Sequence, residues 1–140
     1  MSEPRPLVLD ANILIRAALG PKARGIIERH AHHAEFFVPA LCVTEAREHL
    51  PAIVRKRNLD AELVMTALDA VLDLLHVADA PMYASEMQEA FERLAKRDPQ
   101  DADVLALALV LQCPIWTEDQ DFFGTGVATW TSSQVERYLA

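Results

Sequence analysis

The chain has 140 residues, a length that predicts one domain over residues 1–140 with a sizeable buried core. Hydrophobic residues make up 51% of it, which argues against a disordered protein. No apolar run approaches the roughly 20 residues of a membrane span, which argues against a membrane protein and predicts a cytoplasmic location. The net charge of −8 argues against a general nucleic-acid coat protein, but not against a nuclease, because two bound divalent cations would add about four positive charges to its site.

The first part of the chain alternates between short apolar strands and helices. Strands are predicted over residues 6–9 and 35–38, and helices over residues 13–18, 21–33 and 40–57. Asn12 is expected to cap the first helix, and Gly20-Pro21 to separate it from the second. Pro51 is expected to kink the third helix or to end its first half, because proline lacks the backbone N–H that an interior helix position donates.

The second part of the chain continues the alternation. A helix over residues 61–73 should follow a cap at Asp60, and a strand near residues 74–77 should lead into a turn at residues 79–81. An amphipathic helix is predicted over residues 83–97, ended by Asp98-Pro99, and an almost wholly apolar helix should follow over residues 102–111. Strands are predicted over residues 114–117 and 127–130, and a final helix over residues 132–139.

Alternating strands and helices predict an α/β protein: a three-layer α/β/α sandwich around a central, mostly parallel sheet. Sheets of this kind bind ligands beyond the carboxyl ends of their strands. Asp10 and the segment from Thr117 to Asp119 would emerge at that edge, because each follows a predicted strand directly. The two cysteines, Cys42 and Cys113, lie in apolar surroundings and are expected to be buried thiols rather than a disulfide.

Acidic residues stand at four places where they could converge. They are Asp10 after L-V-L, Glu45 in V-T-E-A-R, Asp101 in D-P-Q-D-A-D, and Asp119 in W-T-E-D-Q-D-F-F. Mg²⁺ and Mn²⁺ prefer oxygen ligands, and two such ions can stabilise the attacking and leaving oxygens of a phosphoryl displacement. Convergence of these carboxylates therefore favours phosphodiester chemistry.

Each acid also has an ordinary structural interpretation. Asp10 could cap the loop after its strand, Glu45 could be a solvated helix residue, and Asp101 is a good N-cap for the apolar helix. Asp119 and Asp121 could form turns, and Thr117 could bond to the turn backbone or position a carboxylate. Asp98 and Asp103 flank Asp101, so the sequence leaves open which of these carboxylates points inward. The joint order of the acids is more specific than any one of them.

That joint order resembles the PIN-domain ribonuclease family, which includes the toxin subunits of VapBC toxin–antitoxin pairs. The resemblance covers nearly the whole chain. V-L-D-A-N-I-L-I resembles the opening strand with the first catalytic acid, and V-T-E-A-R the second motif. D-A-D-V-L-A-L-A-L resembles the third, with its Asp sixteen residues before Thr117, and T-E-D-Q-D-F the Thr-x-Asp-x-Asp-Phe signature. The resemblance implies these catalytic and metal-binding residues: Asp10, Glu45, Asp101 and Asp119.

The resemblance also implies supporting polar residues and a mechanism. The supporting residues would be Asn12, Thr117, Asp103 and Asp121, with Asp103 able to replace or add to the third ligand. Members of the family cut single-stranded RNA with Mg²⁺ or Mn²⁺, many form homodimers, and the toxins are blocked by an antitoxin protein. The implied reaction is hydrolysis by metal-activated water. Asp10, Glu45 and Asp101 would hold a first ion, and Asp119 would help to hold a second or orient the water.

Basic residues offer candidate contacts for a phosphate backbone. The run Arg55-Lys56-Arg57 and the pair Lys96-Arg97 could steer RNA, although the first could equally be a solvated helix end. Arg16 and Arg47 follow acidic motifs and could reach the site. The histidine cluster at residues 30, 32 and 33 is predicted to be solvated at a helix end, and His49 and His76 have no partner at a recognisable spacing.

Two other functions fit parts of the pattern. One is a binding module of the same fold, with weak or absent catalysis, that acts through RNA or protein contacts; the intact set of mutually repelling carboxylates argues against it. The other is a phosphatase-like enzyme with an aspartyl nucleophile, for which Asp10 would serve. That class needs a second Asp two residues later, where this chain has Asn12.

Overall fold

A parallel sheet of five strands forms the centre of the protein. The computed structural model describes residues 3–94 and 101–140. The strands lie in the order β3-β2-β1-β4-β5, and all four neighbouring pairs are parallel. Their bounds are β1 Arg5–Leu9, β2 Ala34–Pro39, β3 His76–Ala78, β4 Ile115–Trp116 and β5 Thr129–Trp130. The α/β fold with a central parallel sheet, predicted from the alternation of elements, is confirmed.

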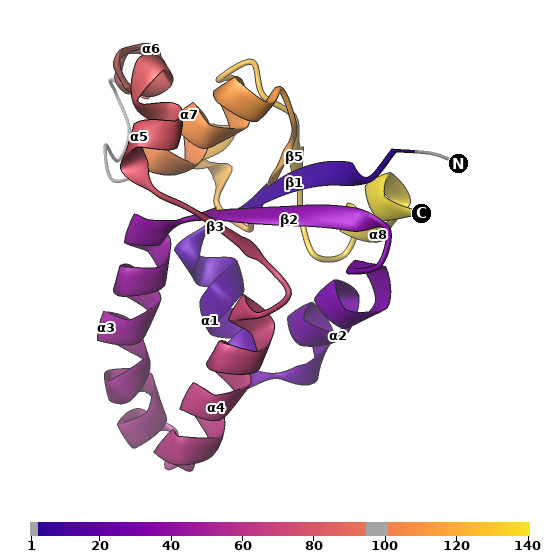
Figure 1. The fold of residues 1–140 in the computed structure, drawn as a ribbon. Helices are drawn as coiled ribbons and strands as arrows, with labels where there is room; N and C mark the ends of the chain where they lie inside the picture. Colours follow the sequence, from indigo (N-terminus) through magenta and orange to yellow (C-terminus); the bar gives the residue numbers. More distant parts are fainter. Residues whose placement is uncertain (1–2, 95–100) are drawn as a thin grey trace.

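Helices cover both faces of this sheet (Figure 1). The helices are α1 Ala11–Leu19, α2 Pro21–His30, α3 Ala40–Lys56, α4 Ala61–Leu72, α5 Ala80–Tyr83, η1 Ala84–Glu86, α6 Met87–Arg93, α7 Ala102–Leu111, η3 Gln120–Phe122 and α8 Val135–Leu139. The first four α-helices lie on one side, and α5, α6 and α7 lie on the other. No helix of the described residues is both long enough and apolar enough to cross a membrane.

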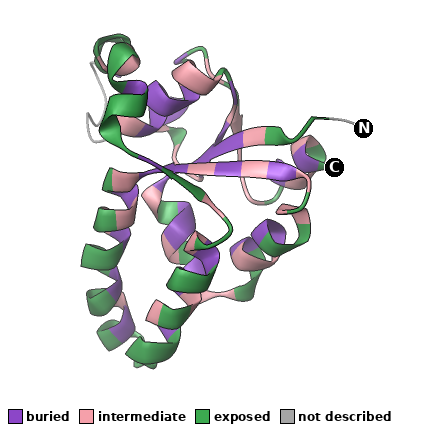
Figure 2. Ribbon diagram, in the orientation of Figure 1, coloured by how far each residue is buried: buried purple, intermediate pink, exposed green. Residues whose placement is uncertain are grey.

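The core lies on both faces of the strands (Figure 2). The last residues of β1, from Leu7 to Leu9, are fully buried, and so is most of α7, which packs against β1 and β2. The apolar run of α7 makes this helix a second central element beside the sheet, as its sequence predicts. Trp116 of β4 is fully buried and Trp130 of β5 is partly buried. Cys42 and Cys113 are buried free thiols, as expected.

Three predictions about the helices differ from the structure. Asp10, not Asn12, caps α1, because its side chain accepts a hydrogen bond from the backbone N–H of Ile13. The α3 helix continues through Pro51, so this proline does not end its first half; the alternative expectation of a kink stays a prediction. The buried side chains of Leu50 and Val54 hold the second half of α3 in place, whereas Pro51 lies on the exposed face of the helix.

The third wrong prediction is the continuous helix over residues 83–97. The segment begins earlier, with α5 in the place of the predicted turn, because Pro81 suits the first turn of a helix. At Tyr83 the backbone leaves the helical region (φ −121°, ψ 12°), which separates α5 from η1 and α6. Ala90 and Leu94 are buried, but Phe91 is 48% exposed. The predicted end at Asp98-Pro99 lies outside the described residues.

The histidine cluster packs the C-terminal helix α8 against the end of α2. His30 Nε2 lies 3.0 Å from Glu136 Oε1, and His33 Nε2 lies 2.8 Å from the carbonyl oxygen of Leu139. Both histidines are partly buried, so the prediction of solvated side chains is wrong for them. These contacts hold α8 against the end of α2, far along the chain from it.

Candidate metal centre at the carboxyl edge of the sheet

Asp10 occupies the middle of the sheet edge. It follows the buried strand β1 and is only 7% exposed. Its Oδ1 accepts a hydrogen bond of 3.0 Å from the N–H of Ile13, which satisfies one of the unpaired donors at the start of α1. The carboxylate therefore caps a helix with one oxygen, and the other oxygen remains available for the neighbouring strand.

Thr117 supplies the contact to that second oxygen. It follows β4, whose Trp116 pairs with Leu9 of β1, so Thr117 and Asp10 leave adjacent strands side by side. The Thr117 hydroxyl donates to Asp10 Oδ2 and accepts a 2.9 Å hydrogen bond from the N–H of Asp119. Both roles that the sequence left open for Thr117 are thus present: it bonds to the turn backbone and it positions a carboxylate.

The four candidate acids line one cavity of about 440 Å³, which we call the acidic cavity. Asp10 comes from the end of β1, Glu45 from α3, Asp101 from the start of α7, and Asp119 from the loop after β4. Segments more than a hundred residues apart in the chain therefore meet around a single space. Asn12, predicted as a supporting residue, also lines this cavity.

Asp121, which the sequence suggests only as a supporting residue, lies close to Asp101 and Asp119. One side-chain oxygen from each of Asp101, Asp119 and Asp121 lies within 4.8 Å of the others, a spacing that could hold a metal ion. Asp119 Oδ1 also accepts a 2.9 Å hydrogen bond from the N–H of Asp121, which fixes the short 3₁₀ turn between them. An all-carboxylate set of this kind fits a hard cation such as Mg²⁺ or Mn²⁺.

Asp103 has a different environment from Asp101. Asp103 Oδ2 accepts a 2.5 Å hydrogen bond from the hydroxyl of Tyr83, a side chain that is only 1% exposed. Asp101 lines the acidic cavity. Sequence reasoning missed Tyr83, because nothing in a chain separation of twenty residues indicates this pairing. It also missed His49, which lines the cavity one helical turn after Glu45; their i, i+4 spacing on α3 was the available signal.

Burial makes the charged form of Asp10 costly without a cation. It raises the pKa of Asp10 to about 6, while the hydrogen bonds from Thr117 and Ile13 oppose that rise and the nearby charges of Asp119 and Glu118 add to it. A divalent cation beside the carboxylate would favour the charged form and reverse this effect. Burial also raises the pKa of the Cys42 thiol in the cavity wall, and the charge of Glu45 adds to the rise. That thiol therefore stays protonated at neutral pH.

The basic residues predicted as candidate phosphate contacts lie at different places in the structure. Arg47 forms a 2.8 Å ion pair with Asp69 on α4 and does not line the acidic cavity. Arg16 and Arg57 line a neighbouring cavity instead. Lys96 and Arg97 lie outside the described residues.

The arrangement of acids around the end of β1 agrees with a match to a known family. A family model described as the PIN domain matches residues 8–140. The chain belongs to the PIN-domain family. A search of curated proteins found no match.

Solved structures with this PIN fold include toxin–antitoxin complexes. PAE2754 from Pyrobaculum aerophilum aligns with a TM-score of 0.73 and 19% identity, over 96% of this chain and 89% of that one. VapBC2 from Rickettsia felis, bound to a DNA fragment from its promoter, has a TM-score of 0.63 and 17% identity over 90% and 98% of the two chains. FitAcB from Neisseria gonorrhoeae has a TM-score of 0.61 and 18% identity over 91% and 98%.

Proposed function

We propose that this PIN domain is a metal-dependent endoribonuclease that hydrolyses phosphodiester bonds of single-stranded RNA. One observation carries the proposal: Asp10, Glu45, Asp101 and Asp119, from four separate segments, line the same cavity at the carboxyl edge of the sheet. Mutually repelling carboxylates have little structural reason to converge, but they are what a site for divalent cations requires. We propose that residues 1–140 form one catalytic domain.

In the proposed reaction, Asp10, Glu45, Asp101 and Asp119 would hold Mg²⁺ or Mn²⁺, with Asp121 as a further carboxylate beside them. A bound divalent ion lowers the pKa of water and stabilises developing negative charge on phosphoryl oxygens. The protein's part is to fix the ligands. The Ile13 N–H and the Thr117 hydroxyl hold Asp10 at both oxygens, and the Asp121 N–H holds Asp119. Such fixed ligands avoid reorganisation during the reaction.

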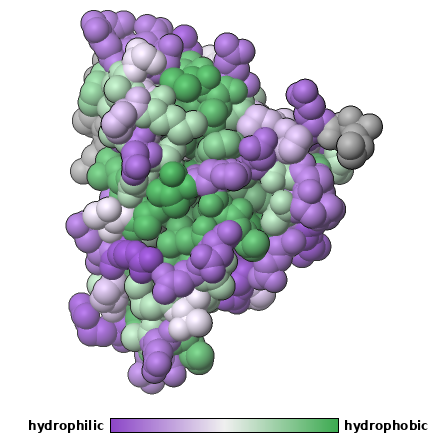
Figure 3. Space-filling model, in the orientation of Figure 1, coloured by the Kyte–Doolittle hydropathy of each residue, from purple (hydrophilic) through white to green (hydrophobic). Residues whose placement is uncertain are grey.

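We further propose that the protein is the toxin of a toxin–antitoxin pair, with an antitoxin protein as partner, and that it forms a homodimer. The folds of solved toxin–antitoxin complexes support the first point. Exposed apolar side chains support a protein contact: Leu74 and Val77, at the edge strand β3, are 40% and 46% exposed. Figure 3 shows hydrophobic surface gathered in the middle of the face that β3 crosses. An RNA substrate agrees with the cytoplasmic location that the sequence predicts.

The test is cleavage of a mixed single-stranded RNA by the purified protein with Mn²⁺, Mg²⁺ or EDTA. The Asp10→Asn variant, which keeps an oxygen for the Ile13 N–H, serves as the matched control. Cutting that needs the metal and is lost in the folded variant would support the nuclease. Equal cutting by the variant would show that the assigned site is wrong.

Two further results would redirect the proposal. A folded protein that binds no divalent ion and cuts no RNA would favour the catalytically weak binding module. A covalent adduct on Asp10, trapped with a phosphate analogue, would identify an aspartyl nucleophile and rule out hydrolysis by activated water.

A further inference from the structure

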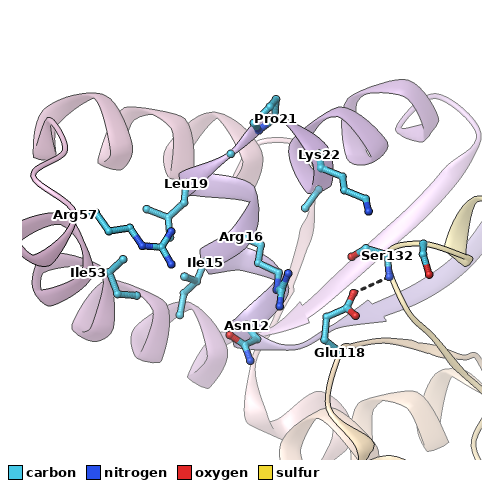
Figure 4. A pocket seen from close by; sticks show the side chains of 13 residues that line it. Asn12, Ile15, Arg16, Leu19, Pro21, Lys22, Ile53, Arg57, Glu118 and Ser132 are labelled. Carbon is cyan, nitrogen blue, oxygen red and sulfur yellow. Dashed lines mark hydrogen bonds between the residues drawn. The ribbon is translucent and has the colours of Figure 1, made fainter.

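A second cavity, of about 520 Å³, lies directly beside the acidic cavity. The two share three wall residues, Asn12, Ile15 and Ile53, so a ligand could extend from one into the other. The second cavity carries positive charge on its walls: Arg16 from α1, Lys22 from α2 and Arg57 at the end of α3 (Figure 4). We call it the basic cavity.

The three cations of the basic cavity have no pairing partner among the described residues. Across residues 3–94 and 101–140, no hydrogen bond or ion pair engages the side chains of Arg16, Lys22 or Arg57. Several other arginines of the chain, but not all of them, are paired with carboxylates: Arg29 with Glu136, Arg47 with Asp69, and Arg93 with Glu89. In a chain of net charge −8, three unpaired cations around one hollow indicate an anionic ligand.

The remaining walls suit a sugar–phosphate chain. Glu118 also lines the cavity, and its carboxylate accepts a 2.7 Å hydrogen bond from the N–H of Ser132 (Figure 4). Ile15, Leu19 and Ile53 offer apolar surface. Within the described part of the chain no aromatic side chain lines this cavity, so base stacking has no platform there.

We propose that the basic cavity binds the phosphodiester backbone of single-stranded RNA next to the bond that is cut, an inference that rests on the proposed nuclease function. Arg16, Lys22 and Arg57 contact the phosphates on that side. The contacts carry no base specificity, because phosphate contacts position a nucleic acid without reading its sequence. An acidic polypeptide fits less well, since its carboxylates would meet the carboxylates of the adjoining cavity, whereas a phosphodiester bound with divalent cations can pass through both.

The experiment measures binding, separately from cleavage. Asp10→Asn protein is titrated onto fluorescently labelled single-stranded RNAs of different sequence at several salt concentrations, with anisotropy as the readout. Arg16→Gln, Lys22→Gln and Arg57→Gln are each added to this background. Each is expected to weaken binding equally for all sequences and to reduce the slope of log K against log salt by about 0.7; the triple variant should lose about 2.

Arg55→Gln is the matched control. It removes the same charge from the end of the same helix as Arg57, but Arg55 does not line the basic cavity. A slope that falls equally in the control and in Arg57→Gln would overturn the inference, because the effect would then come from net charge alone. An unchanged slope for RNA in all three cavity variants would also overturn it. A third overturning result would be binding of polyglutamate, but not of RNA, that these variants abolish.

The binding experiment and the cleavage test can contradict their two proposals separately. Metal-dependent cutting with unchanged salt slopes would leave the nuclease intact and remove the RNA path through the basic cavity. Reduced slopes without any metal-dependent cutting would support RNA binding in the basic cavity and overturn the proposed nuclease activity.

Discussion

The hydroxyl of Thr117 donates a hydrogen bond to Oδ2 of Asp10, across two adjacent parallel strands. Both residues are buried, with Thr117 only 2% exposed. The same hydroxyl accepts the N–H of Asp119, so one small side chain connects two of the candidate metal ligands. Thr117 therefore determines how Asp10 and Asp119 lie relative to each other, and its removal should affect both the fold and the site.

Thr117→Val should destabilise the protein by about 1–3 kcal/mol, because it keeps the side-chain volume but leaves buried polar groups of Asp10 and Asp119 without their partner. The free energy of unfolding in urea measures this. Thr117→Ser keeps the hydroxyl and is the control. A valine variant as stable as the serine variant would contradict the role assigned to this hydrogen bond.

Asp10 should make the metal-free protein less stable as pH rises. Its folded pKa is raised from 3.8 to about 6, so between these values the folded state binds more protons than the unfolded state. The stability is present below about pH 4 and is lost as pH rises through 6, by up to about 3 kcal/mol. Asp10→Asn should therefore be more stable than the wild type in EDTA at pH 7, and the difference should vanish near pH 4.

Urea unfolding of both proteins across this pH range isolates the contribution of Asp10 from that of the other acids. Adding Mn²⁺ at pH 7 should stabilise the wild type more than the variant, because a ligand stabilises only the state that binds it. An Asp10→Asn variant that is less stable than the wild type at every pH would mean that burial of the charged Asp10 carboxylate does not destabilise the folded protein.

Alanine substitutions of Asp101 and Asp103 should have different effects on metal binding and stability. Asp101→Ala removes a cavity carboxylate and should reduce metal binding and cleavage strongly. Asp103→Ala leaves the buried Tyr83 hydroxyl without its acceptor and should cost about 1–3 kcal/mol of stability with a smaller loss of activity. Calorimetric Mn²⁺ titration and urea unfolding of both variants give the comparison. If Asp103→Ala lost metal binding and Asp101→Ala did not, the assignment would have to move to Asp103.

Pro51→Ala should stabilise the protein by about 1–2 kcal/mol. Proline inside α3 gives up a helix hydrogen bond, and its exposed position leaves room for the change, although a proline also restricts the unfolded chain and offsets part of the gain. Thermal unfolding measures the effect. Pro21→Ala is the control, since Pro21 stands in the first turn of α2, where no donor is needed, and it should show no such gain.

Local patterns in the sequence are enough to predict the fold class, because apolar strands and helices that alternate leave few topologies besides a parallel sheet covered on both faces. It also indicated the end of β1 and the start of α7 as places for Asp10 and Asp101, since both positions follow from local patterns. The break after Tyr83 and the continuation of α3 through Pro51 could not be predicted, because packing of Ala90, Leu94, Leu50 and Val54 overrides the local signals there.

Which side chains meet depends on how the strands and helices pack against one another. Strand pairing places Thr117 against Asp10, and the docking of α3 and α7 brings Glu45 and Asp101 to the same cavity. The partner of Asp103, the nearness of Asp121 to Asp101, and the separation of Arg16 and Arg57 from Arg47 depend on contacts between residues distant in the chain. Local periodicity carries no information about such contacts, because it records which face of an element is buried and not what lies opposite.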